Sequence, residues 1–510
     1  MREKVVFGLL LIMLIAFGGI LVTRERRAHQ APAPPAASPV PVAASSGAPA
    51  ASSSAAVDAG IPDAAVVDAA IDAGPADAGS PKLFDRTLRV VVMGWDLAAP
   101  GLLVNGGREP GPASEFSAAG LEVQIAAVDS IAAVEAAMAR GGADKDGADI
   151  VIVPMPSFVA SYERLRALSP EIFFVTGFSR GREALVSAKA GLPSPPVKGE
   201  VKLAAAAAGD PASFLGLFVL DLAGFPPGEV KIGPLDARAD EAPFGAVDRG
   251  SVDPASSPRK TLLLTTADTP RLIPYVAVAQ RGLLEKSGRA AAAWARAWLE
   301  GTRKLAADAP SGARQVTSVQ GAPEPLALLK RLGEVSPATL GDNVRMTGLS
   351  GRGALTLEVL FQRTWQLWRG AGILATPAPE LPPISNAVIA ALARSEPSLV
   401  EPPAVRGVVG ADPKKGGADA DRGKTLLVSR QPEGKLDEEA FVGAAGLIAA
   451  VFERSPIRVA VHQGPAVDAA RTKRLIERVQ DRFDVPAGRL APAKASLGKG
   501  PGAVEVLSVP

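Results

Sequence analysis

A short charged stretch, Ser179–Val186, holds the residues whose types and spacing are best suited to chemistry. Arg180, Arg182 and Glu183 follow the apolar segment Ile172–Thr176, and a second apolar segment begins directly after them. Charged groups held at the end of a sheet strand are well placed to bind a small polar solute. The alternative is a charged surface turn, and this stretch by itself leaves both readings open.

The amino-acid composition argues against catalysis and against metal binding. The chain has no cysteine and only two histidines, His29 and His462, which lie in different regions. Disulfides, thiolate chemistry and cysteine-type zinc sites are therefore excluded, and a histidine-based triad or metal site is not expected. No Gly-x-Ser-x-Gly pattern marks a nucleophile in the middle of the chain. We predict a protein that is not an enzyme and that uses no cofactor or metal.

Chain length and net charge limit the number of domains and the classes of binding partner. The chain has 510 residues, enough for two or three domains of roughly 100–200 residues each. It is 47% hydrophobic, so it can bury a sizeable core. Its net charge is only +2, and no basic stretch is interleaved with aromatic residues, so nucleic acid is not an expected partner.

An uninterrupted apolar run, Val5–Val22, lies near the start of the chain between basic residues. A helix needs about 20 residues at 1.5 Å rise per residue to cross the hydrocarbon core, and this run is just long enough. A cleaved signal peptide would carry small residues directly after the run, whereas Arg24, Arg26 and Arg27 stand there. We therefore expect an uncleaved anchor, spanning residues 1–27 with its flanks, with a cleaved signal segment as the alternative.

Two polar segments divide the rest of the chain. Residues 28–82 are mainly alanine, proline and serine, which predicts a disordered, extended tether that lifts a domain away from a membrane. Residues 401–423 are rich in Gly, Pro, Lys and Asp and predict a second linker.

Apolar strand-like segments alternate with helical ones between the two linkers, which favours an α/β fold. Similar alternation follows in residues 424–510. The expected strands of the first region are Leu88–Met93, Leu121–Val128, Ile150–Val153, Ile172–Thr176, Leu262–Thr266 and Tyr275–Ala279, and its expected helices are Ile131–Arg140, Ser157–Leu168, Pro211–Ala223 and Ala290–Leu305.

Several matches in the same order relate the region from Leu88 to Val278 to a known family. Leu88–Met93 with the loop that follows it, Gly147–Ile152, Ser179–Val186 and the stretch Phe244–Asp248 together resemble the nitrate/sulfonate/bicarbonate and thiamine-precursor type of periplasmic solute-binding proteins. Glu183 stands where that family usually has an Asp.

The resemblance implies a type 2 periplasmic-binding-protein clamp, with two α/β lobes joined by two crossover strands. Lobe one would comprise residues 83–187 and 275–400, and lobe two residues 188–274. Loops at the carboxyl ends of α/β strands are where such sheets bind ligands, and Asp210 and Ser213 open a helix whose free N–H groups favour an anion. The expected ligand-binding residues are Trp95, Asp96, Ser157, Ser179, Arg180, Glu183, Asp210, Ser213 and Asp248.

Structural roles compete with several of these assignments. Trp95 could plug the core, Ser213 could simply begin a helix, and Asp248 could cap a turn. Only one arginine of the pair Arg180 and Arg182 can face the cleft, and we expect it to be Arg180. An arginine there would hold a carboxylate, sulfonate or phosphate through paired hydrogen bonds.

Residues 424–510 resemble the OmpA-like peptidoglycan-associated domain. Leu426–Ser429, Ile457–Gly464 and Val485–Leu490 carry the likeness. Family members hold a cross-bridge amino acid with one Asp and one Arg, but the Asp position falls on Gly464. The resemblance implies that Asp468, Arg471 or Arg474 would supply the remaining peptidoglycan contacts.

These features predict a single-pass protein of the cell inner membrane whose bulk is periplasmic. It would capture a small, anionic solute and carry a wall-facing OmpA-like module, with an ABC permease and peptidoglycan as further partners. The basic residues after the anchor, taken alone, favour a cytoplasmic body, but the two resemblances favour the periplasm. The alternative function is an envelope scaffolding or interaction protein whose ligand cleft is vestigial.

Overall fold

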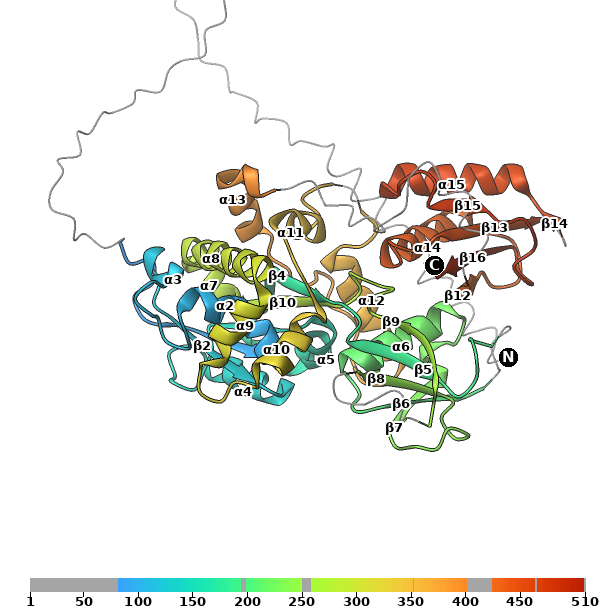
Figure 1. Ribbon diagram of the computed structural model, residues 1–510. Coiled ribbons are helices and arrows are strands. Elements are labelled where there is room, and N and C mark those ends of the chain that lie inside the picture. Colours follow the sequence, from blue (N-terminus) through green and yellow to red (C-terminus); the bar gives the residue numbers. More distant parts are fainter. Residues whose placement is uncertain are drawn as a thin grey trace, which may run out of the picture. The chain divides into compact units, whose positions relative to one another are not determined.

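The computed structural model describes residues 81–193, 199–249, 258–351, 353–400, 424–463 and 466–508 (Figure 1). The predicted membrane helix at 5–22, nearly all of the predicted tether 28–82, the second linker 401–423 and Gly464 lie outside these residues. Within the described residues, no helix is both long enough and apolar enough to span a bilayer.

Two sheets with the same internal plan form the middle of the chain. In the first sheet the order is β11-β4-β10-β3-β1-β2, where β2, β1 and β3 are parallel and β10 runs antiparallel between β3 and β4. The strands are β1 (Leu88–Met93), β2 (Val123–Val128), β3 (Ile150–Pro154), β4 (Pro170–Ser179), β10 (Pro274–Gln280) and β11 (Val335–Pro337).

The second sheet repeats this plan with the order β7-β6-β8-β5-β9. Here β7, β6 and β8 are parallel, and β5 runs antiparallel between β8 and β9. Its strands are β5 (Glu183–Ser187), β6 (Val201–Ala205), β7 (Val230–Pro234), β8 (Phe244–Asp248) and β9 (Thr261–Thr265).

The chain passes between the sheets twice. After each passage it enters the antiparallel strand of the next sheet, β5 after the first and β10 after the second. The first crossing joins β4 to β5 at residues 180–182, and the second joins β9 to β10 at residues 266–273. This topology gives two α/β lobes joined by two crossing segments, as expected. The first crossing precedes β5, so residues 183–187 belong to the second sheet. The expected boundary at residue 187 is therefore a few residues late. We call the first sheet with its helices lobe one, and the second sheet with α6 lobe two.

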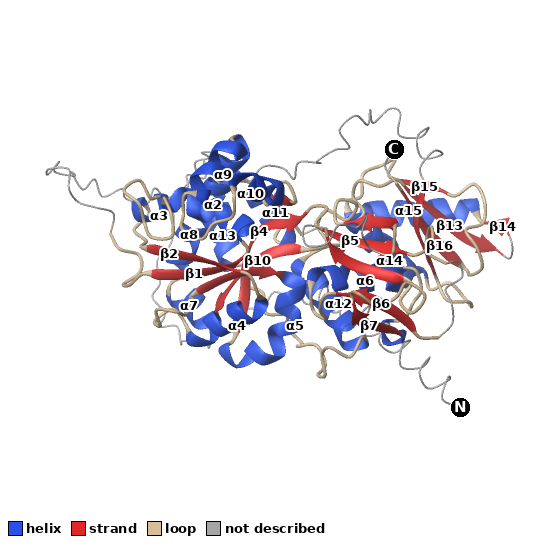
Figure 2. Ribbon diagram, turned by 60° about the horizontal axis from the view of Figure 1, so that its bottom comes forward, coloured by secondary structure: helices blue, strands red, loops and turns tan. Residues whose placement is uncertain are grey.

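Helices cover both faces of the first sheet (Figure 2). On one face α2 and α8 pack around Trp294 and Trp298, whose rings lie 4.9 Å apart, and on the other face lie α4 and α5. The helices up to residue 400 are α2 (Trp95–Asn105), α3 (Glu115–Ala118), α4 (Ile131–Arg140), α5 (Met155–Leu165), α6 (Pro211–Leu222), α7 (Arg281–Lys286), α8 (Gly288–Ala307), α9 (Ala309–Thr317), α10 (Pro325–Leu332), α11 (Leu340–Met346), α12 (Leu357–Gly370) and α13 (Ala387–Ser395).

Helix α12 packs on both lobes. The Trp368 indole N–H donates to the Pro156 carbonyl oxygen of α5 at 3.0 Å, and its ring lies 5.9 Å from that of Phe214 in α6. Arg363 also forms an ion pair with Asp221 of α6. The lobes are therefore held together by a buried helix in addition to the two crossings.

Residues 424–508 form a third sheet with two helices. Its order is β12-β16-β13-β14, and β15 pairs in parallel with β13. The elements are β12 (Thr425–Arg430), α14 (Glu438–Val451), β13 (Ile457–Gln463), β14 (Ala466–Val467), α15 (Ala469–Phe483), β15 (Leu490–Pro492) and β16 (Gly502–Leu507).

The loop expected after the first strand is instead the helix α2. Gly94 has φ +99°, a conformation that favours glycine, and this turn lets the helix begin directly at Trp95. Pro100 lies inside the helix, and its presence together with Trp95 and Asp96 made the segment look like a loop. The consequence is that Asp96 lies on the first turn of a buried helix.

A glycine contact between α2 and α8 allows us to test this packing. A Cβ added to Gly301 would lie 2.1 Å from the Pro100 carbonyl oxygen, which is too close for the backbone to accommodate without a shift. We expect Gly301→Ala to lower the free energy of unfolding by about 1–3 kcal/mol, measured by denaturant titration. Gly282→Ala is the control, because a Cβ there meets nothing within 4 Å. Equal stability of the two variants would contradict the close approach.

Candidate functional site

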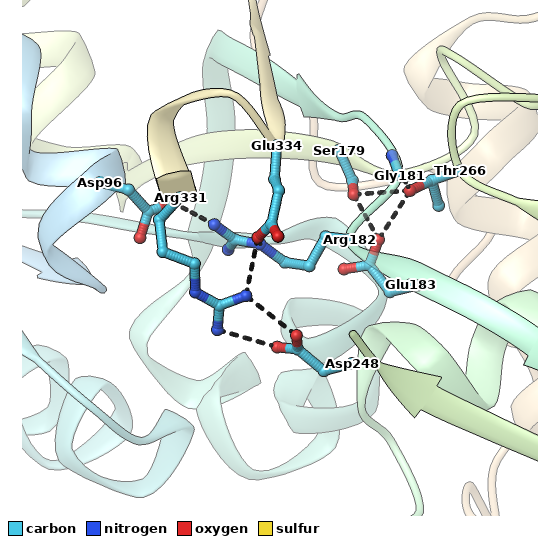
Figure 3. A network of polar contacts seen from close by, with 9 residues as sticks. All are labelled: Asp96, Ser179, Gly181, Arg182, Glu183, Asp248, Thr266, Arg331 and Glu334. Carbon is cyan, nitrogen blue, oxygen red and sulfur yellow. Dashed lines mark hydrogen bonds and ion pairs between the residues drawn. The ribbon is translucent and has the colours of Figure 1, made fainter. Parts of the chain in front are cut away.

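A chain of ion pairs between the lobes is centred on Arg182 (Figure 3). Arg182, in the first crossing, forms an ion pair with Asp96 of α2, and its Nε lies 3.6 Å from a carboxylate oxygen of Glu334. Its side chain is only 11% exposed, and its guanidinium lies 5.7 Å from the centre of the Tyr275 ring. A buried cation thus bridges lobe one and the first crossing.

Arg331 extends this network to lobe two. It donates to Glu334 at 2.8 Å and to both carboxylate oxygens of Asp248, at 2.9 and 3.2 Å. Arg331 lies in α10 of lobe one, and Asp248 is the last residue of β8 in lobe two. The ion pairs of Arg331 therefore connect the two lobes directly.

The surroundings of these two arginines stabilise their protonated, charged forms. Burial by itself would lower the pKa of Arg182, but Tyr275, Asp96 and Glu183 together raise it above the ordinary value. Burial likewise works against the charge of Arg331, and its hydrogen bonds with Asp248 and Glu334 raise its pKa. Both guanidinium groups therefore stay charged.

A second cluster ties the two crossings together around Glu183, whose side chain is buried at the start of β5. Ser179, at the end of β4, donates to its carboxylate, and Thr266 of the second crossing donates to the same oxygen at 3.1 Å. The Thr266 hydroxyl also accepts the Gly181 backbone N–H at 2.8 Å. Both connections between the lobes are thus held at one buried carboxyl group (Figure 3).

The two neighbouring arginines differ in burial, and Arg180 as a ligand contact stays a prediction. Arg180 is exposed, and its backbone N–H donates to the Glu334 carbonyl oxygen at 2.8 Å, whereas Arg182 is the residue that lies between the lobes. The reason is the turn at Gly181, which has φ +80° and directs successive residues differently. Of the other predicted residues, Asp96, Ser179, Glu183 and Asp248 belong to the two clusters.

The remaining predicted residues do not join these clusters. Asp210 caps α6 by accepting the Ser213 backbone N–H at 2.5 Å, and the Ser213 hydroxyl donates back to the Asp210 carbonyl oxygen at 3.0 Å. The Arg108 guanidinium lies over the Trp95 ring, 5.4 Å from the centre of that ring. Ser157 is buried in α5. As ligand contacts, all four stay predictions.

Arg331 and Glu334 were missed by the sequence reading. They lie about 150 residues after Arg182, beyond the stretch that carries the family resemblance. Their i, i+3 spacing with opposite charge was the only available signal, and it is common on exposed helices.

A pocket of about 180 Å³ opens in lobe one next to the Arg182 network. Asp96 belongs to both, and the pocket residues Leu332 and Val335 flank Arg331 and Glu334 in the chain. The remaining walls are largely apolar, contributed by Leu97, Pro100, Thr176, Trp298, Thr302, Leu305, Ala306, Ala309 and Pro337.

Another pocket, of about 400 Å³, lies between the end of α2 and α9, with Lys304, Asp308 and Gln315 in its wall. Neither of these two pockets is lined by Arg180, Ser213 or Trp95.

Comparisons with known proteins bear on the fold only. No family model matches the chain, and no curated protein matches it. Among similar solved structures is the periplasmic sulfonate-binding protein of Methylobacillus flagellatus, with 13% identity and a TM-score of 0.43 over 62% of this chain and 96% of that one.

Two further solved structures are similar. The alkanesulfonate-binding protein of Xanthomonas axonopodis has 15% identity and a TM-score of 0.39, covering 59% of this chain and 98% of that one. The nitrate-binding protein of Synechocystis has 14% identity and a TM-score of 0.37, covering 61% and 93%. At such low identities and scores, no ligand or activity of those proteins transfers to this chain.

The Glu183 carboxyl should make folding pH-dependent. Burial raises its pKa, and Arg182 and Ser179 offset only part of that effect. Because the native state then holds this proton more tightly than the unfolded chain, the stabilising contribution is complete below the unfolded pKa near 4.5 and is lost as pH rises through the native value.

We expect Glu183→Gln to remove this part of the pH dependence, so that its stability falls less than that of the wild type as pH rises above 4.5. Urea unfolding at several pH values measures it. Glu477→Gln, at an exposed position of α15, serves as the control and should keep the wild-type slope. Identical slopes for the wild type and Glu183→Gln would contradict the burial argument.

Proposed function

We propose that the chain is an extracytoplasmic clamp that captures a small polar solute between its two lobes. The observation that carries this proposal is the meeting of Asp96, Arg182, Arg331, Glu334 and Asp248 at one place, supplied by lobe one, the first crossing and lobe two. Charged groups converging from two hinged lobes suit a ligand that both lobes bind at once.

Solute binding would work by exchange of ion pairs. Glu334 lies between Arg182 and Arg331, and a carboxylate, sulfonate or phosphate group of a solute has the same hydrogen-bonding capacity. An incoming anionic group would replace Glu334 as the partner of these two guanidinium groups as the lobes open and close. The proposed solute therefore carries an anionic group, as expected from the sequence, and its main partner is Arg182 in place of Arg180.

The setting of the clamp is part of the same proposal. The apolar run Val5–Val22 would anchor it in the inner membrane, residues 28–82 would tether it in the periplasm, and an ABC permease would receive the solute. The strand order of residues 424–508, with β16 between antiparallel β12 and β13 and with β15 parallel to β13, supports the OmpA-like module in this proposal.

A second candidate function is an envelope interaction protein whose cleft is vestigial. One observation favours it: the carboxylates of Asp96, Glu334 and Asp248 already satisfy the two arginines. In that case the ion pairs would hold the lobes permanently together, and no small solute would bind.

A thermal-shift screen of the full-length protein separates these functions. The probes are small carboxylates, sulfonates, phosphates and amino acids. A ligand at 100 times its dissociation constant stabilises the native state by about 2.7 kcal/mol, which gives a clear rise in Tm. We expect at least one probe class to raise Tm; a flat screen would favour the interaction protein.

The two neighbouring arginines provide a matched pair of variants. Arg182→Lys keeps the charge but loses the planar pair of donors, so we expect the bound probe to bind at least tenfold more weakly. Arg180→Ala, which removes an exposed side chain, should leave the affinity within about twofold. The reverse pattern in calorimetric titrations would refute the role proposed for Arg182.

Wall binding by the C-terminal module can be tested separately. Asp468 caps α15 by accepting the Arg471 backbone N–H at 2.9 Å, and the Glu438 carboxylate already holds Arg471 and Arg474, at 2.8 and 3.2 Å. A wall fragment would have to displace Glu438. We expect Glu438→Gln to increase co-sedimentation with purified peptidoglycan and Arg471→Ala to reduce it. No retention of any of the three proteins would refute wall binding.

A further inference from the structure

The charge balance of the Arg182 network restricts the solute more narrowly than its arginines suggest. Among the five side chains of the network, two guanidinium groups, Arg182 and Arg331, face three carboxylates, Asp96, Glu334 and Asp248, so these five carry one more negative than positive charge. Even with the exposed Arg180 counted, the carboxylates are only matched. A purely anionic solute would add negative charge to a site that is already acidic or neutral.

One donor of the network is left for a ligand. Arg182 Nε has no hydrogen-bond partner within the described part of the chain, because Glu334 lies 3.6 Å from it, beyond hydrogen-bond distance. An unmet guanidinium N–H in a buried position is costly and is readily satisfied by a carboxylate oxygen. The Nη2 group of Arg182 donates to Asp96, whose carboxylate can also bind a cationic group.

Asp96 also lines the pocket of about 180 Å³ in lobe one. An apolar cavity of roughly 150 Å³ is large enough to bind benzene, so this pocket can take a side chain of four to six carbons. The indole N–H of Trp298, another residue of its wall, is buried without a partner within the described residues. A positive site, a negative site and an apolar pocket therefore meet at Asp96.

We infer that the solute is a small zwitterion with an apolar side chain, of the α-amino-acid type. Its carboxylate would bind Arg182 and its ammonium would bind Asp96. Its side chain would fill the pocket of about 180 Å³ that α2 helps to line. Inserting it between Asp96 and Arg182 replaces one ion pair by two and leaves the net charge of the site unchanged. This inference rests on the proposed solute-binding function and narrows its ligand class.

Three matched probes test the inference by calorimetric titration of the full-length protein. They are L-leucine, 4-methylpentanoate, which lacks the amino group, and 3-methylbutylamine, which lacks the carboxylate. We expect leucine to bind at least tenfold more tightly than either of the others. We also expect L-alanine to bind roughly 50-fold more weakly than leucine, since each buried methylene contributes about fourfold.

The outcomes distinguish this inference from the proposed function. If 4-methylpentanoate or 3-methylbutylamine binds as tightly as leucine, the zwitterion is refuted while a solute-binding clamp remains. If none of the three binds but another probe of the thermal-shift screen does, the inference again fails and the clamp stands. A screen in which nothing binds refutes both.

Two pairs of variants locate the site. Asp96→Asn should weaken leucine binding roughly 10- to 100-fold without weakening 4-methylpentanoate, whereas Asp240→Asn, in an exposed pair with Arg238, should change neither. Ala306→Leu, at the pocket wall, should weaken leucine but not alanine binding. Ala307→Leu, at the next exposed position of α8 and outside the pocket wall, is its control. Equal effects of the two alanine variants would overturn the pocket assignment.

Discussion

The burial of the Arg182 guanidinium is the constraint on which the arrangement of the lobes depends. A charge that is almost removed from water must be neutralised nearby, and removing one partner of such a pair typically costs about 3–5 kcal/mol. Arg182 is neutralised by Asp96, and Glu334 links it to Arg331 and so to Asp248 of lobe two. The ion pairs of Arg331 with Asp248 therefore add a charged contact between the lobes to the apolar contacts that α12 makes with both of them.

Arg182 and Glu183 are neighbours with different tasks. Arg182 belongs to the ion-pair network through its contact with Asp96, while Glu183 accepts hydrogen bonds from the hydroxyl groups of Ser179 and Thr266. Successive residues entering a strand point to opposite sides, which separates the two functions within one dipeptide. In the proposed clamp, a hinge motion would turn both crossings about this buried carboxyl, because Thr266 lies on the second crossing and Ser179 precedes the first.

Sequence reading succeeded where the signal is local. The runs Leu88–Met93 and Ile131–Arg140 were placed with the bounds that the structure has, since their apolar pattern and flanking glycine and serine specify them. It failed for α2, which has a proline inside the helix, and for Arg331 and Glu334. Their importance comes from contacts with Asp248 and Arg182, which lie far earlier in the chain. It also could not tell that Arg180 is exposed and Arg182 buried, since the turn at Gly181 lies between them.

Helix α12 determines what kind of motion can release the network. It contacts α5 of lobe one through Trp368 and α6 of lobe two through Phe214 and Asp221, so these two helices cannot separate without exposing an aromatic core. The ion pairs at Arg331, in contrast, are about one-third exposed and can be exchanged for water or solute at small cost. In the proposed clamp, opening would be a rotation about α12 and the crossings, in which Asp248 leaves Arg331 first. The buried pair of Arg182 and Asp96 would then be the last contact to break, and a solute that offers both charges would replace it without leaving either group unpaired.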